Sequence, residues 1–337
     1  VFLLVNLGSP QSPKTHDVRR YLRQFLMDGR VIDIPAFPRW LLVNGVIAPF
    51  RAPSSAVKYR SIWTDEGSPL IVLTRRLARK LENYSGIPVY YCMRYGAPGP
   101  YEVMRQIISD HSQTKEVILF PLYPHYAMSS YETAVEYVKQ IWQKNAFPFH
   151  LRTIEPYYNH PDYIDALSNS ILPWLDEDYD HLLFSYHGIP ERHLLKTDPT
   201  GHHCLSDDDC CRTPSPAHAF CYRHQVLETT QLVVDHLKLS EDRFSISFQS
   251  RLGRDKWLGP ATNTVLRQLP QKGVKKLLVV TPAFVSDCLE TLEEIRQEGR
   301  ETFLEAGGEA FSHIPCLNDR DEWVETVFRI VSNKFHF

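Results

Sequence analysis

The sequence predicts an α/β protein with two doubly wound domains, each built on a parallel sheet that is covered by helices on both faces. The chain has 337 residues, which is long for one core and comfortable for two domains of ordinary size. Short apolar runs alternate with longer helix-like stretches along its length. Because these runs do not alternate polar with apolar residues, they are typical of parallel strands buried on both faces.

In the first half, an apolar run at the amino terminus ends at the turn residues Gly8, Ser9 and Pro10. Helix-like stretches then separate further apolar runs, as βα units require. We expect strands at Phe2–Val5, Val89–Tyr95, Val117–Tyr123 and Phe149–Ile154, and helices at His16–Met27, Tyr101–His111 and Ser130–Trp142.

The second half repeats this arrangement, without an obvious repeat in sequence. We therefore expect an N-terminal domain over residues 1–155 and a C-terminal domain over residues 156–337. We expect strands there at His181–Ser185, Phe244–Phe248 and Lys276–Thr281, and helices at Pro161–Leu175, Ala217–Leu237, Ala261–Leu269, Asp287 to about Ala306, and Glu322–Val331.

Composition narrows the class of protein. Hydrophobic residues make up 43% and charged residues 23% of the chain, which is typical of a folded globular protein. The net charge of −3 offers no basic surface for a nucleic acid, so we expect none as a partner. No apolar run reaches the roughly 20 residues that span a bilayer. The chain begins at Val1, so we expect a few residues to precede it, and no signal or transit peptide is recognisable.

Ligands of doubly wound folds bind beyond the carboxyl ends of the strands. Neither the GxGxxG nor the GxxxxGK[ST] pattern is present, so a nucleotide site is not supported. His187 stands at one strand end, where an imidazole can act as a base or bind a metal, although a structural histidine at a tight turn is the simpler interpretation. Gly188 after it permits a ligand to approach the backbone closely.

A row of carboxylates follows another strand. Asp287, Glu290, Glu294 and Glu298 would lie on one stripe of an α-helix. Like charges one turn apart cost about 0.2–0.5 kcal/mol per pair, so the row is either well solvated or matched by cations. Oxygen ligands of this kind suit Mg²⁺ or Fe²⁺.

Four of the seven cysteines lie close together, at Cys204, Cys210, Cys211 and Cys221. With no export signal, such a cluster indicates a metal or redox site in a reducing compartment. Its spacing is not that of a zinc ribbon. Four thiolates are the usual ligands of a [2Fe–2S] or [4Fe–4S] centre, while structural zinc and free thiols remain alternatives.

Two further stretches combine Arg and hydroxyl groups with aromatic residues, around Tyr59–Leu70 and Met93–Gly96. Arg suits the carboxylates of a ligand, and the aromatic residues suit a flat apolar body. Each stretch could equally consist of ordinary core residues and the surface residues around them, without a ligand.

Taken together, these segments resemble ferrochelatase, the enzyme family that inserts Fe²⁺ into a porphyrin to make haem. Eight motifs stand in the family's order over nearly the whole chain. The matching segments are Asn6–Pro10, Tyr59–Trp63 with Gly67–Pro69, Met93–Gly96, Leu122–Tyr126, Ser185–Pro190, Phe248–Arg251, Trp257–Pro260 and Ser286–Leu292. The resemblance implies two flavodoxin-like or Rossmann-like domains with a porphyrin cleft between them.

The resemblance also implies roles for individual residues. His187 and Glu290 would be catalytic and would face the porphyrin centre from opposite sides. The same two residues, with Glu294 and Glu298, would handle the metal and protons. Porphyrin would be bound by an apolar lip of Phe25, Leu26 and Met27 and by Arg51, Ser68, Arg94, Tyr95, Tyr123 and Trp257.

The mechanism implied by the family bends the porphyrin out of plane, so that a pyrrole proton can move to His187 while ferrous iron enters. Many relatives have His where Cys288 stands, and animal-type members place cluster cysteines elsewhere. Met128 occupies one of those positions. The chain resembles instead a bacterial subgroup with an internal four-cysteine insert, about residues 201–221, which assigns a [2Fe–2S] cluster to Cys204, Cys210, Cys211 and Cys221.

Protoporphyrin IX and ferrous iron are the expected substrates. A coproporphyrin III ferrochelatase or a related cobalt chelatase is the alternative within the class, and a non-enzymatic haem or iron–sulfur protein is a remote one. We expect a cytoplasmic protein with possible peripheral contact with the inner membrane surface. The sequence carries no signal for a particular oligomeric state.

Overall fold

The computed structural model describes residues 1–251, 253 and 255–335; residues 336 and 337, the end of the expected C-terminal domain, lie outside these ranges. The chain divides into two compact units. The first contains Val1–Tyr123 and Met128–Glu155, and the second contains Pro124–Ala127 and Pro156–Phe337. Each unit has its own four-stranded sheet, and every strand pairing is parallel. The predicted fold class is therefore confirmed.

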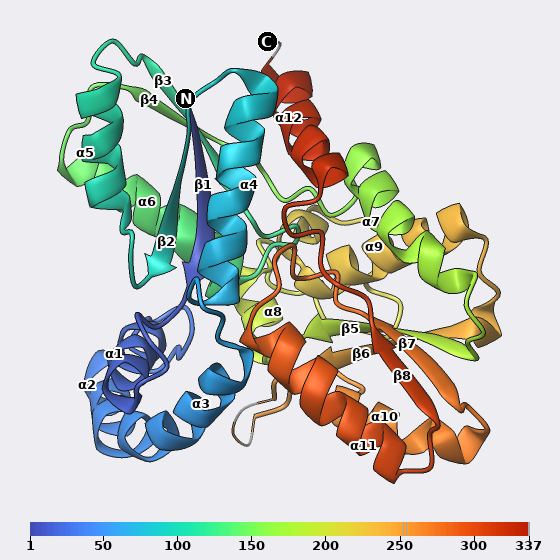
Figure 1. Ribbon diagram of the computed structural model, residues 1–337. Coiled ribbons are helices and arrows are strands. Elements are labelled where there is room, and N and C mark those ends of the chain that lie inside the picture. Colours follow the sequence, from blue (N-terminus) through green and yellow to red (C-terminus); the bar gives the residue numbers. More distant parts are fainter. Residues whose placement is uncertain (252, 254, 336–337) are drawn as a thin grey trace. The chain divides into compact units, whose positions relative to one another are not determined.

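The first sheet has the strand order β2-β1-β3-β4. Helix α4 packs on β1 and β2, α6 packs on the same sheet, and in Figure 1 α1, α2 and α3 gather near the carboxyl end of β1. Its elements are β1 Phe2–Gly8, α1 Thr15–Leu26, α2 Ala36–Leu41, η1 Leu42–Ile47, α3 Ala48–Ile62, α4 Pro69–Ser85, β2 Val89–Tyr95, α5 Pro100–Asp110, β3 Glu116–Pro121, η2 Met128–Glu132, α6 Thr133–Lys144 and β4 His150–Thr153.

The second sheet has the strand order β6-β5-β7-β8. Its elements are α7 Pro161–Leu175, β5 His181–His187, α8 Glu191–Thr197, η3 Pro216–Phe220, α9 Tyr222–Leu237, η4 Glu241–Arg243, β6 Phe244–Gln249, α10 Thr262–Gln268, η5 Pro270–Lys272, β7 Lys276–Val280, η6 Glu290–Gly299, α11 Arg300–Glu305, β8 Ala310–His313 and α12 Asp321–Phe335.

A glycine at the end of β1 shows how tightly the strand ends are packed. Gly8 has φ +105°, and a Cβ there would lie 1.7 Å from the carbonyl oxygen of Tyr95 on the neighbouring strand. A side chain is excluded by both the backbone conformation and this contact. The turn predicted after the first strand is therefore fixed by packing against β2.

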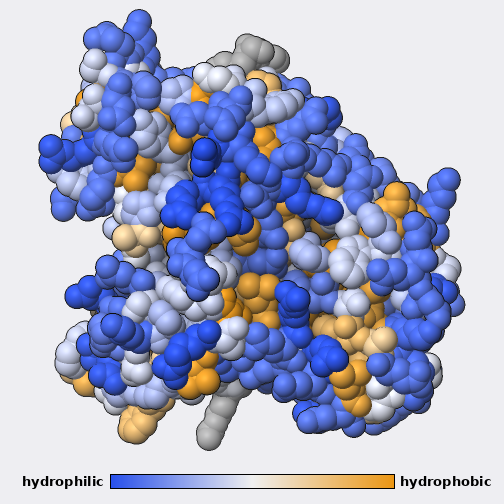
Figure 2. Space-filling view, in the orientation of Figure 1, coloured by the Kyte–Doolittle hydropathy of each residue, from blue (hydrophilic) through white to orange (hydrophobic). Residues whose placement is uncertain are grey.

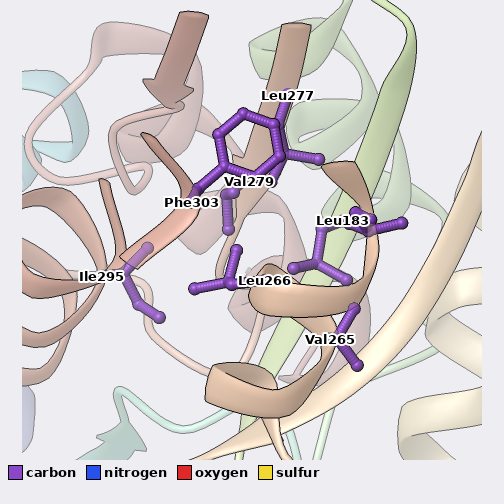
Figure 3. Close-up of a cluster of buried hydrophobic side chains, with 8 residues drawn as sticks. Leu183, Val265, Leu266, Leu277, Val279, Ile295 and Phe303 are labelled. Carbon is purple, nitrogen blue, oxygen red and sulfur yellow. The ribbon is translucent and has the colours of Figure 1, made fainter. Parts of the chain in front are cut away.

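A buried apolar cluster fastens the second unit's helices to its sheet (Figure 3). Leu183 of β5 and Leu277 and Val279 of β7 face Leu266 of α10, while Phe303 of α11 is fully buried among them. Ile295 adds the η6 segment to the same cluster. The cluster thereby anchors η6, which carries the predicted acidic row. Its members are Leu183, Val265, Leu266, Leu269, Leu277, Val279, Ile295 and Phe303.

Candidate active site

The backbone of His187 is held on three sides. His187 is the last residue of β5 and pairs with Gln249 of β6. The hydroxyl of Tyr222 donates a hydrogen bond to the carbonyl oxygen of His187 at 2.9 Å, and the amide of Gly188 donates to the carbonyl oxygen of Gln249 at 2.8 Å. The position of the imidazole is therefore set by β6 and α9 as well as by its own strand.

The turn after His187 leaves no room for a side chain. A Cβ on Gly188 would lie 2.7 Å from the carbonyl oxygen of Gln249 and 3.3 Å from Cε3 of Trp257. Trp257 is partly exposed and forms an isolated bridge with Pro190. The predicted porphyrin-binding Trp257 thus lies beside the segment that carries His187.

The imidazole of His187 is neutral at physiological pH. Its Nδ1 is buried and has no hydrogen-bond partner among the described residues, while the residue as a whole is partly exposed. The ring meets Phe284 edge-on, with centroids 6.0 Å apart. Burial lowers the pKa of His187 below 6.5, and the negative charge of Glu290 opposes this shift. A neutral ring whose Nδ1 is enclosed presents Nε2 as the nitrogen that can reach a proton or a metal ion.

Gln249 places Glu290 near this imidazole. The Gln249 side chain accepts a hydrogen bond from the Ser185 hydroxyl at 2.9 Å and donates one to the carbonyl oxygen of Glu290 at 2.9 Å. It therefore joins β5 and β6 to the first residue of η6. The Glu290 side chain is half-buried and acts electrostatically on His187. The two predicted catalytic residues are thus brought together within the second unit.

The acidic row differs from the one predicted. The expected α-helix from Asp287 to about Ala306 is wrong at its start and in its type, because residues 290–299 form a π-helix and an α-helix follows. Asp287 precedes the helix and is buried, and its carboxylate accepts hydrogen bonds from Thr291 at 2.8 Å and Asn318 at 2.7 Å. Asp287 is therefore a structural residue, whereas the glutamates at 290, 294 and 298 lie in η6.

Glu294 is bound to the end of β6. Its carboxylate accepts hydrogen bonds from the amide of Ser250 at 2.7 Å and from the Ser250 hydroxyl at 2.5 Å. Ser250 has φ +67°, a left-handed conformation that costs a non-glycine residue about 1 kcal/mol or more. The two bonds to Glu294 compensate for that cost. Glu298, by contrast, is exposed.

Cys288 is a buried thiol. Burial, followed by the negative charge of Glu290, raises its pKa well above 9.0. The thiol is therefore protonated at neutral pH and is a poor metal ligand in that state.

The predicted porphyrin-binding residues other than Trp257 belong to the first unit. Phe25 and Tyr95 are in edge contact, with centroids 5.1 Å apart. Arg94 forms a salt bridge with Asp28, donates to Thr133 at 2.8 Å, and lies over the Tyr95 ring. The structure therefore engages Arg94 in a nearly buried network of its own unit.

The remaining predicted residues differ in exposure. Leu26, Ser68 and Tyr123 are buried, Met27 is half-buried, and Arg51 is exposed on α3. Of the two predicted arginines, Arg51 is thus the more accessible to a ligand.

The four clustered cysteines are all buried and converge. A hydrogen bond from Cys211 lowers the pKa of Cys221 to about 6, and Cys204 also donates to it. The pKa of Cys204 is raised by burial and by the charge of Cys221, and that of Cys211 by its hydrogen bond to Cys221. The Arg223 guanidinium lies 3.9 Å from the Cys210 sulfur. The set therefore holds one thiolate, at Cys221, and a cation beside Cys210.

Asp198 organises the loop that carries these thiols. Its carboxylate accepts hydrogen bonds from the amides of Thr200, His203 and Cys204, each at 2.8 Å. Burial alone would raise the pKa of Asp198, but these bonds lower it far below 3.8.

Over residues 1–251, 253 and 255–335, no group of three or more His, Cys, Asp and Glu side chains is arranged to hold a metal ion.

Three residues of this site were not predicted individually. Gln249 and Ser250 lie in the Phe248–Arg251 motif, but the sequence gives no sign that they form hydrogen bonds with Glu290 and Glu294. Tyr222 lies directly after the last clustered cysteine, and only the fold shows that its hydroxyl meets His187.

Comparison with known proteins identifies the family. The family model described as Ferrochelatase matches residues 2–335. A ferrochelatase from Opitutus terrae is 50% identical over 326 residues, which cover 96% of this chain and 94% of the relative. A ferrochelatase from Ectopseudomonas mendocina is 51% identical over 324 residues, with the same coverage. The chain belongs to the ferrochelatase family.

A solved structure agrees at the level of the fold. The protein described as SirB from Bacillus subtilis with Fe3+ superposes with a TM-score of 0.51 at 11% identity, over 80% of this chain and 93% of that chain. As a member of the ferrochelatase family, the chain is an enzyme of the metal-chelatase class, which confirms the expectation drawn from the motifs.

Proposed function

We propose that this ferrochelatase inserts ferrous iron into protoporphyrin IX, the final step of haem formation. The observation that carries the proposal is the neutral imidazole of His187, enclosed at Nδ1 and accompanied by the carboxylate of Glu290. Two pyrrole protons must leave as the dication enters the ring. A base that is neutral at physiological pH and lies next to an anion meets this requirement.

In this mechanism, Nε2 of His187 accepts a pyrrole proton and Glu290 stabilises the resulting imidazolium. Glu294 and Glu298 continue from Glu290 along η6, and they carry protons toward solvent, where Glu298 is exposed, or iron in the opposite direction. Part of the porphyrin binding energy goes into bending the ring, which exposes the pyrrole lone pairs.

His187→Ala tests the proposal. We expect iron insertion to fall by at least about 100-fold, since general acid–base groups contribute 10²–10⁴-fold. Anaerobic Fe²⁺ insertion measures the loss, and circular dichroism checks the fold. His236→Ala is the matched control, because His236 is also in the second unit but lies at the surface, 3.3 Å from Asp165. A folded His187→Ala enzyme with normal turnover would contradict the assignment.

Porphyrin binding is assigned to Phe25, Leu26, Met27, Arg51, Ser68, Arg94, Tyr95, Tyr123 and Trp257. Among the arginines, exposed Arg51 is the better candidate for a propionate, because Arg94 is paired with Asp28. The apolar lip favours the less carboxylated ring. Turnover with protoporphyrin IX against coproporphyrin III, and with Fe²⁺ against Co²⁺, separates the proposed activity from the two alternatives in its class.

We also propose that Cys204, Cys210, Cys211 and Cys221 hold a [2Fe–2S] cluster. The donor chemistry supports this proposal: four buried cysteines supply thiols, Cys221 is hydrogen-bonded to Cys211 and Cys204 and has a pKa of about 6, and Arg223 lies beside Cys210. The cluster would supply one-electron redox chemistry, which metal insertion does not require. The measurement is the visible spectrum together with iron and acid-labile sulfide per chain. A colourless protein that contains zinc and no sulfide would contradict the assignment.

The cysteines also support a proposal for the cell location. All seven cysteines are free in the structure, a state that a reducing compartment favours. We therefore assign the protein to the cytoplasm. None of the helices in the described ranges has the length and apolar character needed to cross a bilayer.

Peripheral contact with the membrane is supported by one surface of the first unit. Between Asp33 and Asp65 the chain has four basic residues and no acidic one. In Figure 2, apolar side chains interrupt the hydrophilic surface over the α1–α3 group. The exposed apolar residues there are Phe37, Trp40, Leu41, Leu42, Val46, Phe50 and Val57. Apolar and basic residues on one surface are the combination that binds anionic lipid.

A further inference from the structure

Helix α9 connects the cysteine cluster with the end of β5. Cys221 is the N-cap residue of α9, and its sulfur accepts a hydrogen bond from the amide of His224 at 3.5 Å. The next residue, Tyr222, is 4% exposed and donates its hydroxyl to the carbonyl oxygen of His187 at 2.9 Å. One peptide bond therefore separates a cluster thiol from the residue that holds His187.

Further contacts make this end of α9 a rigid connection. The side chain of Gln225 donates to the carbonyl oxygens of His218 at 3.1 Å and Ala219 at 3.0 Å, which lie within the cysteine insert. Five residues further along α9, Thr230 shares a hydrogen bond of 2.8 Å with the hydroxyl of Tyr186, the neighbour of His187. Since Gln225 and Thr230 are both buried, water cannot readily replace these bonds.

The insert itself depends on its sulfur atoms. Cys204 and Cys221 are separated by a segment without regular structure until η3, and three of its thiols are linked to one another by hydrogen bonds. A bound metal cluster would tie these four points together far more strongly than thiol hydrogen bonds do. Removing the cluster would therefore loosen the N-terminus of α9.

We propose that Tyr222 is a positioning residue through which the cysteine cluster fixes the catalytic imidazole of His187. The inference rests on the proposed function, and it gives the cluster a structural role in a reaction that needs no electron. Loss of the cluster loosens the first turn of α9, releases the His187 carbonyl from the Tyr222 hydroxyl, and lets the imidazole leave its productive position.

The test is Tyr222→Phe, which removes one hydroxyl and keeps the buried ring. We expect the visible spectrum and the iron content of the variant to equal those of the wild type, while kcat falls roughly tenfold and KM for the porphyrin is little changed. Tyr131→Phe is the matched control, because the Tyr131 hydroxyl also donates to a backbone carbonyl, that of Ile154 at 2.8 Å, in the other unit. It should leave kcat unchanged.

Amide hydrogen exchange at residues 185–190 provides a readout apart from turnover. In the wild type, removal of the cluster by chelation, or by Cys204→Ser, should speed exchange there. In Tyr222→Phe, exchange should already be fast and should not respond to the cluster. The inference is overturned if Tyr222→Phe has the kcat of the wild type. It is also overturned if amide exchange in the wild type is the same with and without the cluster. If the isolated protein contains no iron and sulfide, the connection between the cluster and His187 is overturned, but the proposed metal insertion is not. If the wild type inserts no iron, the proposed function itself is overturned.

Discussion

At the scale of single residues, the environment of His187, the proposed base, suits a group that gains a proton and releases it again. When Nε2 accepts a proton, the ring becomes a cation, and burial disfavours that charged form. The protonated state is therefore costly, so the proton leaves readily. The charge of Glu290 offsets part of the cost, which allows the protonated state to form at all.

Glu290→Gln should separate these two effects. The amide keeps the size of the side chain and removes the charge, so the imidazolium loses its stabilising partner. We expect kcat for iron insertion to fall by about 10²-fold or more, with porphyrin binding retained. Steady-state kinetics against porphyrin concentration measures both. Glu309→Gln, an exposed carboxylate of the same unit, is the control, and an unchanged kcat in Glu290→Gln would remove Glu290 from the mechanism.

Asp28 gives a prediction for pH. Burial alone would raise its pKa, but hydrogen bonds from Thr133, the Arg30 amide and Tyr95, with the charge of Arg94, hold it below 3.8. A lowered pKa stabilises the fold above the ordinary value of the carboxyl, and this contribution is lost as pH falls through the lowered value.

Asp28→Asn should therefore be less stable than the wild type at neutral pH, by about 3–5 kcal/mol, because a nearly buried Arg94 loses its partner. The difference should shrink toward pH 3 and below. Urea unfolding at several pH values measures it. A stability difference that does not depend on pH would show that the charge of Asp28 does not matter.

At the scale of elements, the sequence predicted strands better than helix types. The buried apolar runs located β2 at its observed bounds, and most other strands within two residues, because a strand buried on both faces has a clear composition. β8 was missed because it is short and only its last residue is buried. The π-helix η6 was missed because its carboxylates, four apart, would also share a face of an α-helix.

The long helix expected over Ala217–Leu237 shows a related limit. The structure breaks it at Cys221, where η3 ends and α9 begins. The motifs singled out His187 and Glu290 as expected catalytic residues, and the hydrogen bonds to their backbone carbonyls come from Tyr222 and Gln249. Such contacts join residues far apart in the chain, and no local pattern encodes them.

The anchoring of η6 gives a prediction for stability. Phe303→Ala removes a fully buried ring from the cluster that contains Ile295, and we expect a loss of about 3–5 kcal/mol in the free energy of unfolding. Chemical denaturation followed by circular dichroism measures it. Phe37→Ala makes the same change at a residue that is 71% exposed, and it should alter stability by less than about 0.5 kcal/mol. Equal losses in the two variants would mean that the cluster does not anchor the unit.

At the scale of the whole molecule, the alternation of apolar runs predicted two parallel sheets, and the structure has them. The exposed apolar residues of α2 and α3 were not anticipated as a group. They are spread over two helices and η1, and their exposure depends on which neighbours cover them.

Binding to vesicles tests this surface. The double variant Trp40→Ala with Phe50→Ala should reduce co-sedimentation with anionic phosphatidylglycerol vesicles at least about fivefold, since each buried aromatic side chain contributes more than 1 kcal/mol. Tyr84→Ala, which removes an exposed aromatic residue from α4, should have no effect. Wild-type protein that stays in the supernatant would rule out the membrane contact.

The two sheets share one strand order, and in each a glycine at the end of the first strand packs closely against a carbonyl oxygen of the neighbouring strand, Gly8 on Tyr95 and Gly188 on Gln249. Only the second unit carries an ionisable side chain at that position; the first unit has leucine, glycine, serine and proline there. The first unit thus has the same architecture without a side chain that could accept a proton. Each polypeptide should therefore metallate a single macrocycle at a time.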